Sequence, residues 1–129
     1  MKKVLLFLLI ILLIASCDFF GHPADLCIVN RSSSKIYFYV SNKFPDTSLP
    51  LTSNYVKPIP PNDGYCFENF KRKPYPDLGK MDKIIIFFFD ADTIEYYKWD
   101  VIREDYKILE RRMLTKQDII NNNWDIVYP

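Results

Sequence analysis

Acidic side chains are the residues of this 129-residue chain whose types and positions could do chemistry. Asp90 and Asp92 follow a strongly apolar run, and Asp46 lies in a proline-containing stretch nearer the N-terminus. Two carboxyl groups that face each other across a cleft can hydrolyse a glycosidic bond, and clustered carboxylates can bind calcium. Such aspartates more often cap a helix or bond to turn amides. A small hydrolytic or carbohydrate-active accessory protein using these acids is therefore the alternative hypothesis; no metal site is predicted, because the pattern of a calcium loop is missing.

The small number of histidines and glycines argues against several classes of enzyme chemistry. His22, the single histidine of the sequence, lies between Gly21 and Pro23, where no regular element is expected to hold it. A catalytic triad or a zinc site needs histidine next to a nucleophile or further ligands. The chain has three glycines, whereas phosphate-binding loops and nucleophile elbows depend on glycine-rich turns. The leading hypothesis is therefore a non-enzymatic binding or scaffolding domain without a cofactor.

The N-terminal segment combines charge, an apolar run, small residues and a cysteine in a set order. Lys2 and Lys3 precede the unbroken apolar run Val4–Ile14, which at about 1.5 Å per residue covers roughly half of a ~30 Å hydrocarbon core. The residues up to Cys17 are similar to the lipobox of bacterial lipoproteins. This resemblance implies that the chain is cut between Ser16 and Cys17 and that Cys17 carries the acyl chains. The alternatives are an ordinary signal peptide with a chance cysteine, or an uncleaved helix.

The predicted export defines the organisation of the chain and its compartment. We expect a lipoprotein signal peptide at 1–16, a lipidated tether at 17–24 and a single domain at 25–129. Several acyl chains, each contributing ~0.8 kcal/mol per buried methylene, form a durable anchor. The predicted location is the bacterial cell envelope, with the lipid in the inner or the outer membrane.

The charge balance narrows the class of partner. The 17 basic and 16 acidic residues give a net charge of +1, and removal of residues 1–16 takes away two lysines. The mature protein is therefore near neutral and lacks the basic footprint of a nucleic-acid binder. We expect the membrane, through the lipid anchor, and an envelope protein or glycan as partners.

Two cysteines remain after Cys17 is assigned to lipid. In an oxidising compartment an even count favours a disulfide between Cys27 and Cys66. The bridge would close a loop of about 40 residues and contribute roughly 4 kcal/mol in the chain-entropy model. Two buried free thiols, acting as small apolar side chains, are the alternative.

Hydrophobic patterning predicts a mainly β fold: a β-sandwich of about seven strands with one or two short C-terminal helices. The predicted strand Lys83–Asp90 contains six consecutive apolar residues without alternation, which indicates burial on both faces. A helix over Thr93–Asp105 is expected to cover one of these faces, and Thr115 and Asp118 resemble a capping box at the start of a second helix. The first two strands are expected to form a hairpin. The remaining predicted strands cover Leu26–Asn30, Ile36–Ser41, 54–59, 65–70, 106–112 and 124–128.

Two further candidate sites lie on these elements. Tyr37, Tyr39 and Trp99 could form an aromatic platform for a sugar or peptide, or could pack on the sheet face under the helix. Thr93, in the triplet Asp92-Thr93-Ile94, resembles the O-glycosylation acceptor that some bacteria use on exported proteins.

The C-terminal third resembles a group of short bacterial lipoproteins of unknown function from host-associated anaerobes. The tail and a Phe-Pro-Asp-Thr loop carry the resemblance, which extends over residues 26–129. It implies export and a lipid-anchored domain and assigns no catalytic residue. The matching residues are Phe44, Pro45, Asp46, Thr47, Asp92, Thr93, Trp99, Asp100, Ile102, Arg103, Tyr106, Arg111, Leu114, Thr115, Asp118, Trp124, Tyr128 and Pro129.

Overall fold

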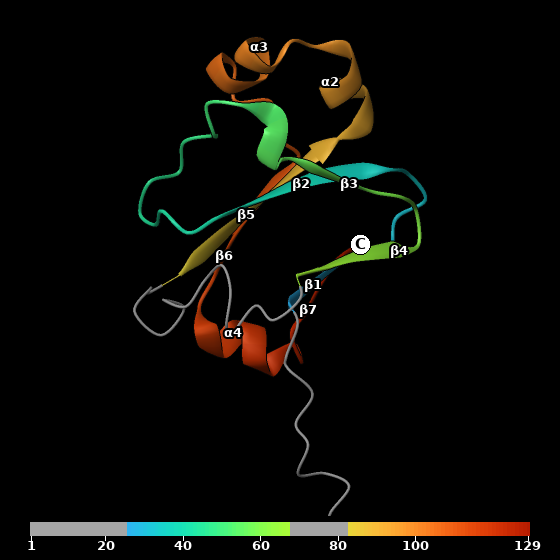
Figure 1. The fold of residues 1–129 in the computed structure, drawn as a ribbon. Helices are drawn as coiled ribbons and strands as arrows, with labels where there is room; N and C mark the ends of the chain where they lie inside the picture. The colour runs from blue at the N-terminus through green and yellow to red at the C-terminus, as the bar shows by residue number, and fades with distance from the viewer. Residues whose placement is uncertain (1–25, 68–82) are drawn as a thin grey trace, which may run out of the picture.

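The computed structural model describes residues 26–67 and 83–129, which form a mainly β, sandwich-like fold (Figure 1). This confirms the predicted fold class, with three short α-helices in place of one or two. The described strands are β1 (Leu26–Asn30), β2 (Ile36–Ser41), β3 (Lys57–Ile59), β4 (Asp63–Phe67), β5 (Ile84–Asp90), β6 (Glu110–Leu114) and β7 (Asp125–Tyr128). The helices are the 3-10 turn η2 (Ser53–Tyr55) and the α-helices α2 (Ala91–Tyr96), α3 (Trp99–Glu104) and α4 (Lys116–Asn121).

The strands form two sheets, of order β4-β1-β7 and β3-β2-β5-β6. β1 runs antiparallel to β4 and parallel to β7, and the second sheet is antiparallel throughout. The predicted hairpin of β1 and β2 is therefore wrong, because the two strands lie in different sheets. Asn30 explains the crossing: its side chain is fully buried and donates to the carbonyls of Ser34, Ile59 and Pro60. These bonds direct the chain from one sheet to the other instead of back along β1.

Strand β5 is buried on both faces, as its unbroken apolar sequence predicts. Ile84, Ile86 and Phe88 pack in the core between the two sheets. Ile85, Phe87 and Phe89 belong to a second core, on the outer face of the four-stranded sheet, which also contains Leu49 and Ile102. A strand whose side chains alternate between two dry environments needs apolar residues at every position.

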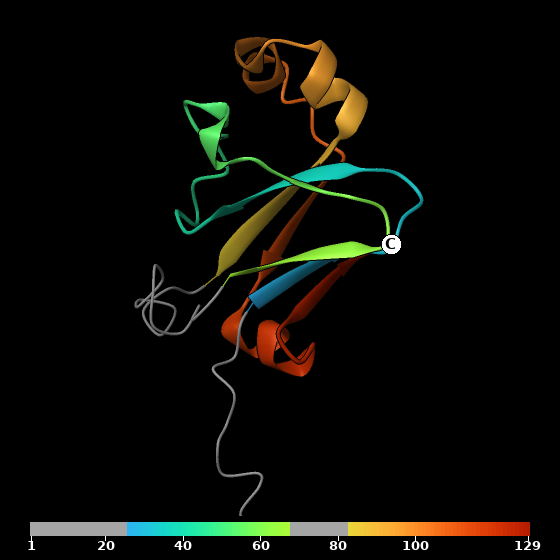
Figure 2. The same cartoon turned by 45° about the vertical axis from the view of Figure 1, so that its right-hand side comes forward.

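Two helices, not one, cover the outer face of the four-stranded sheet. Tyr97 and Lys98 have extended backbone angles and separate α2 from α3, where the sequence predicts one helix over Thr93–Asp105. With this break, Ile94 and Trp99 both pack against the second core. Figure 2 shows α2 and α3 on one side of the sheets and α4 on the opposite side of the molecule.

Helix α4 connects the two sheets. Thr115 and Asp118 form the predicted capping box, in which each side chain bonds the backbone N–H of the other residue. Ile119 is fully buried against the core between the sheets. β6 begins later than predicted because Tyr106 has a φ of 51°, which is incompatible with a strand.

The remaining boundaries differ from the prediction by a few residues. The predicted strand 54–59 is divided into η2 and the short β3, and β4 begins at Asp63 instead of residue 65. None of the helices in 26–67 and 83–129 has the length and apolarity needed to cross a bilayer.

Candidate functional site

An open sheet edge beside β2 is the candidate functional site. β3 pairs with Ile36–Phe38 only, so that β5 is the one strand neighbour of Tyr39–Ser41 in the described chain. Two hollows of about 470 Å³ and about 310 Å³ open at this half of β2, and both are lined by Tyr39, Val40 and Tyr55. We call the two hollows together the edge groove. Its other lining residues are Phe38, Asn42, Lys43, Pro50, Leu51, Thr52, Asn54, Lys57 and Phe67.

The shortness of β3 creates this groove. Its N-terminal limit is the 3-10 turn η2, which is closed by a 2.9 Å bond from the Val56 N–H to the Ser53 carbonyl. Because β3 is antiparallel to β2, this turn stops the ladder at Lys57, opposite Phe38, and leaves Tyr39–Ser41 without a partner from β3. The loop that forms the far wall is held in place by the indole N–H of Trp99, which donates to the Pro50 carbonyl at 2.9 Å.

The groove is apolar in its middle and positively charged. Leu51 and Tyr55 are 78% and 65% exposed, unusually open for side chains of this size. Among the described residues of its lining, Lys43 and Lys57 are the charged ones, and none carries a carboxylate. Lys57 has a weak 3.4 Å bond from its ammonium to the Asn54 carbonyl. An exposed apolar surface with charged flanks fits the binding of a partner.

Two of the three candidate acids bond to turn or helix amides, and the third is exposed. The Asp46 carboxylate accepts the Ser48 N–H at 2.9 Å, and this bond holds the pKa of Asp46 below its ordinary value. Asp90 caps α2 by accepting the Thr93 N–H at 3.0 Å. Asp92 is exposed in the first turn of the same helix. Asp46 and Asp90 are thus engaged with backbone N–H groups, whereas glycoside hydrolysis uses two carboxyl groups that flank the scissile bond.

Two further hollows open on the described surface, and each has an acid in its lining. One of about 250 Å³ is lined by Asp90 with Lys107, and one of about 320 Å³ by Glu104 with Arg103. Among the described residues, each lining therefore has one carboxylate and one basic side chain. Within 26–67 and 83–129, no three His, Cys, Asp or Glu side chains are gathered to hold a metal ion.

The predicted aromatic platform is mostly part of the second core. Tyr37, Tyr39 and Trp99 are half-buried and pack against it. The ring of Tyr39 stacks on Phe87 at 5.8 Å, and Trp99 meets Phe89 edge-on at 5.9 Å. Tyr39 alone of the three also lines the edge groove.

Glu95 explains the environment of Tyr37. Its carboxylate pairs with Lys35 and accepts the Tyr37 hydroxyl at 3.1 Å. These two bonds, chiefly the one to Lys35, lower the pKa of Glu95, and the same pair raises the pKa of Lys35. The hydroxyl of Tyr37 is thus engaged with a neighbour on its own surface.

Sequence reasoning missed Leu51 and Tyr55, the exposed apolar residues of the groove. Leu51 stands in a loop expected from Pro45 and Pro50, and Tyr55 falls in the predicted strand 54–59. Two large apolar residues beside a proline-bounded loop are the signal that could have identified them.

The other predicted sites fall in three places. Cys27 and Cys66 are opposite one another on β1 and β4 and are joined by a disulfide. Thr93 is half-buried, and its hydroxyl lies 3.4 Å from the carboxylate of Asp90. Ser16 and Cys17, the predicted cleavage and lipidation residues, lie outside the described residues, as does His22.

No protein-family model, curated protein or solved structure matches this chain. The resemblance of the tail to short bacterial lipoproteins therefore stays a prediction, and the fold and the groove are the features from which a function is argued.

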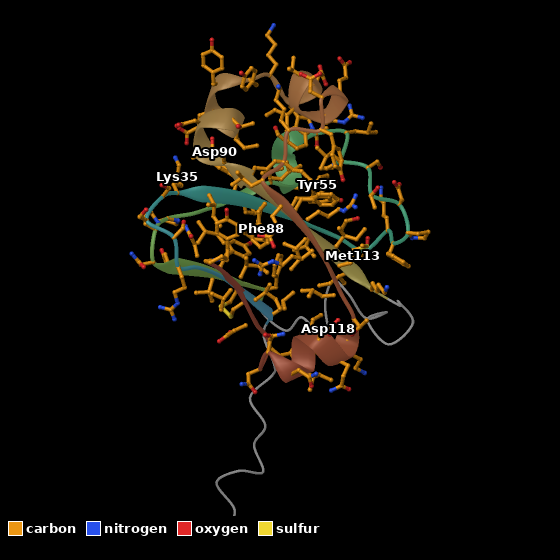
Figure 3. All side chains as sticks on the ribbon, turned by 180° about the vertical axis from the view of Figure 1, so that it is seen from behind. Lys35, Tyr55, Phe88, Asp90, Met113 and Asp118 are labelled. Carbon is orange, nitrogen blue, oxygen red and sulfur yellow. A yellow bond between two sulfur atoms is a disulfide. The ribbon has the colours of Figure 1, made fainter. Side chains whose placement is uncertain are left out.

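Figure 3 shows Tyr55, which lines the edge groove, and Asp90 on the side of the molecule opposite Asp118 of α4.

Proposed function

We propose that this protein is a lipid-anchored component of the bacterial cell envelope whose domain binds a partner without catalysing a reaction. The observation that carries the proposal is the edge groove, which combines exposed apolar side chains with Lys43 and Lys57 and has no acid among the lining residues that the structure describes. General acid–base catalysis needs a titratable group near its working pH within reach of the substrate. The groove offers surface for binding and lysines for charge, which favours recognition.

The roles of the acids support this proposal over the carbohydrate-active alternative. Asp46 and Asp90 each accept a backbone N–H, an arrangement that stabilises a turn or a helix start. If the alternative held, replacing Asp46, Asp90 and Asp92 together by asparagine would abolish release of reducing ends from envelope glycans. We expect the wild-type protein and the triple variant to give the same background rate.

The anchor is the second part of the proposal. In the mature protein Cys17 would carry the lipid, and a fully extended chain from Cys17 to Leu26 reaches roughly 30 Å. The domain would therefore act close to the membrane surface. Cys17→Ala should move the protein from the membrane fraction to the soluble fraction, or leave its signal peptide uncleaved. An unchanged membrane fraction without acyl mass on the N-terminal peptide would contradict the anchor.

The groove is tested by site-specific photo-crosslinking of the anchored protein. A photoreactive amino acid at position 55 should give a discrete crosslinked species in intact cells. The same amino acid at Lys116, exposed on α4 on the opposite side of the molecule, is the matched control. Identical products from both positions, or none from position 55, would contradict binding through the groove.

A further inference from the structure

We propose that the open half of β2 binds an extended acidic peptide as an additional strand, placed in line with β3. This inference rests on the proposed function and names the partner class of the edge groove. An extended peptide that adds to a sheet edge gains its affinity from backbone hydrogen bonds and its specificity from pockets for alternate side chains.

The direction of the backbone groups of β2 follows from its neighbours. The Leu109 N–H donates to the Phe88 carbonyl at 2.8 Å, so Phe88 turns its backbone groups toward β6. Phe38, opposite Phe88 on β2, therefore turns its own toward β3. Because strand residues alternate, Val40 turns the same way, at a point where β3 has ended. Within the described residues no loop or turn bond reaches Val40.

The two hollows match the alternation of an added strand. The smaller hollow is lined by Phe38 and Phe67, and the larger one by Pro50 and Leu51. Val40 lines both. Successive side chains of an extended peptide point to opposite faces, so they would enter the two hollows in turn. Exposed Tyr55, which lines both, would contact side chains on either face.

The positive charge of Lys43 and Lys57 favours a peptide with acidic residues. Lys57 is the first residue of β3, opposite Phe38, and Lys43 follows the last residue of β2 by two positions, so a lysine lies near each end of the open stretch Tyr39–Ser41. A pentapeptide whose three middle residues lie opposite this stretch, a length of about 10 Å, would place a carboxylate toward each lysine. The carboxylate of Asp46 bonds the Ser48 N–H, which is the main reason that the pKa of Asp46 is lowered, and the charge of Lys43 lowers it further.

The other edge of the four-stranded sheet is already bridged. Arg112 on β6 donates to the Val127 carbonyl on β7 at 2.6 Å and pairs with Glu110. Lysines beside an open edge discourage pairing with another copy of the same chain. An acidic strand converts that repulsion into attraction, which is why we assign the edge to an acidic peptide.

Peptide binding to the full-length lipoprotein in detergent micelles tests this inference. The probe is the blocked pentapeptide acetyl-Glu-Val-Thr-Val-Glu-amide. We expect saturable binding, weakened about fivefold or more when Lys43 and Lys57 are replaced by glutamine. Lys116→Gln is the matched control and should leave the affinity unchanged. Equal loss in the control, or no binding by the wild-type protein, would overturn the inference.

Backbone pairing is tested without altering the protein. N-methylation of the central threonine keeps the charges of the peptide, removes one N–H donor and should weaken binding about tenfold. The bound unmethylated peptide should also slow hydrogen exchange at the Val40 amide. Equal affinity of the methylated peptide, or unchanged exchange at Val40, would refute strand addition.

Failure of this inference is distinguishable from failure of the proposed function. If position 55 crosslinks a partner in cells while the acidic peptide does not bind, the peptide class is wrong and binding through the groove stands. Stronger binding of a chito-oligosaccharide, or a dimer through this edge in sedimentation, would replace the peptide by a glycan or a second copy.

Discussion

Removing the Cys27–Cys66 disulfide should destabilise the domain by about 4 kcal/mol. The two cysteines are 39 residues apart, and the loop between them contains β2, η2 and β3. In the chain-entropy model, closing a loop of this length lowers the entropy of the unfolded chain by about 13 cal/mol/K, or about 4 kcal/mol near 25 °C. Cys66 is exposed and Cys27 half-buried, so alanine at both positions leaves little empty space in the folded protein. Most of the effect should therefore arise in the unfolded state.

The assay is urea unfolding of Cys27→Ala/Cys66→Ala against the oxidised wild-type protein. With a slope of about 2 kcal/mol/M, the midpoint should fall by roughly 2 M. Val127→Ala, on the same sheet and partly exposed, is the control and should change stability by no more than about 0.5 kcal/mol. A loss below about 1 kcal/mol in the double variant would refute the loop-entropy reasoning.

Four further substitutions test the core, the cap of α4 and the groove wall. Phe88→Ala, at a fully buried position between the sheets, should cost about 3–5 kcal/mol in urea unfolding, whereas Met113→Ala, 46% exposed on the neighbouring strand, should cost far less. Thr115→Ala should cost about 1 kcal/mol by removing the cap of α4. Because the Thr115 N–H lowers the pKa of Asp118, the stability that Asp118 contributes is present above its ordinary pKa and is lost as pH falls through the folded-state pKa. Asp118→Asn should therefore reduce the acid dependence of stability, and parallel pH profiles of variant and wild type would contradict this. Trp99→Phe removes the bond to Pro50 and should cost about 1 kcal/mol while loosening the groove wall, which proteolysis of the 42–56 loop would detect.

The elements that are specified by consecutive residues could be predicted from the sequence. The apolar run that became β5 and the Thr115–Asp118 capping box are written in consecutive residues, and the structure confirms both. The pairing of β1 with β7 is not local, because a parallel partner comes from the far end of the chain. The expected hairpin failed for a similar reason, since Asn30 bonds to carbonyls about 30 residues away.

The candidate site was harder to predict than the fold. Aromatic residues on β2 and at the start of α3 suggested a platform, but Tyr37, Tyr39 and Trp99 lie against the second core. The edge groove depends on β3 beginning only at Lys57, and that position follows from the η2 turn that precedes it. The sequence pattern of 54–59 predicted one strand and did not show this turn.

Binding of a partner through the edge groove of a lipid-anchored domain can be tested by photo-crosslinking from position 55 in intact cells, in the wild-type background and in Cys17→Ala. We expect a discrete crosslinked partner in the wild type, its loss when the lipid anchor is removed, and no such product from position 116. Crosslinking that is absent at position 55, or that is the same at position 116, would contradict a lipid-anchored domain that binds through its edge groove.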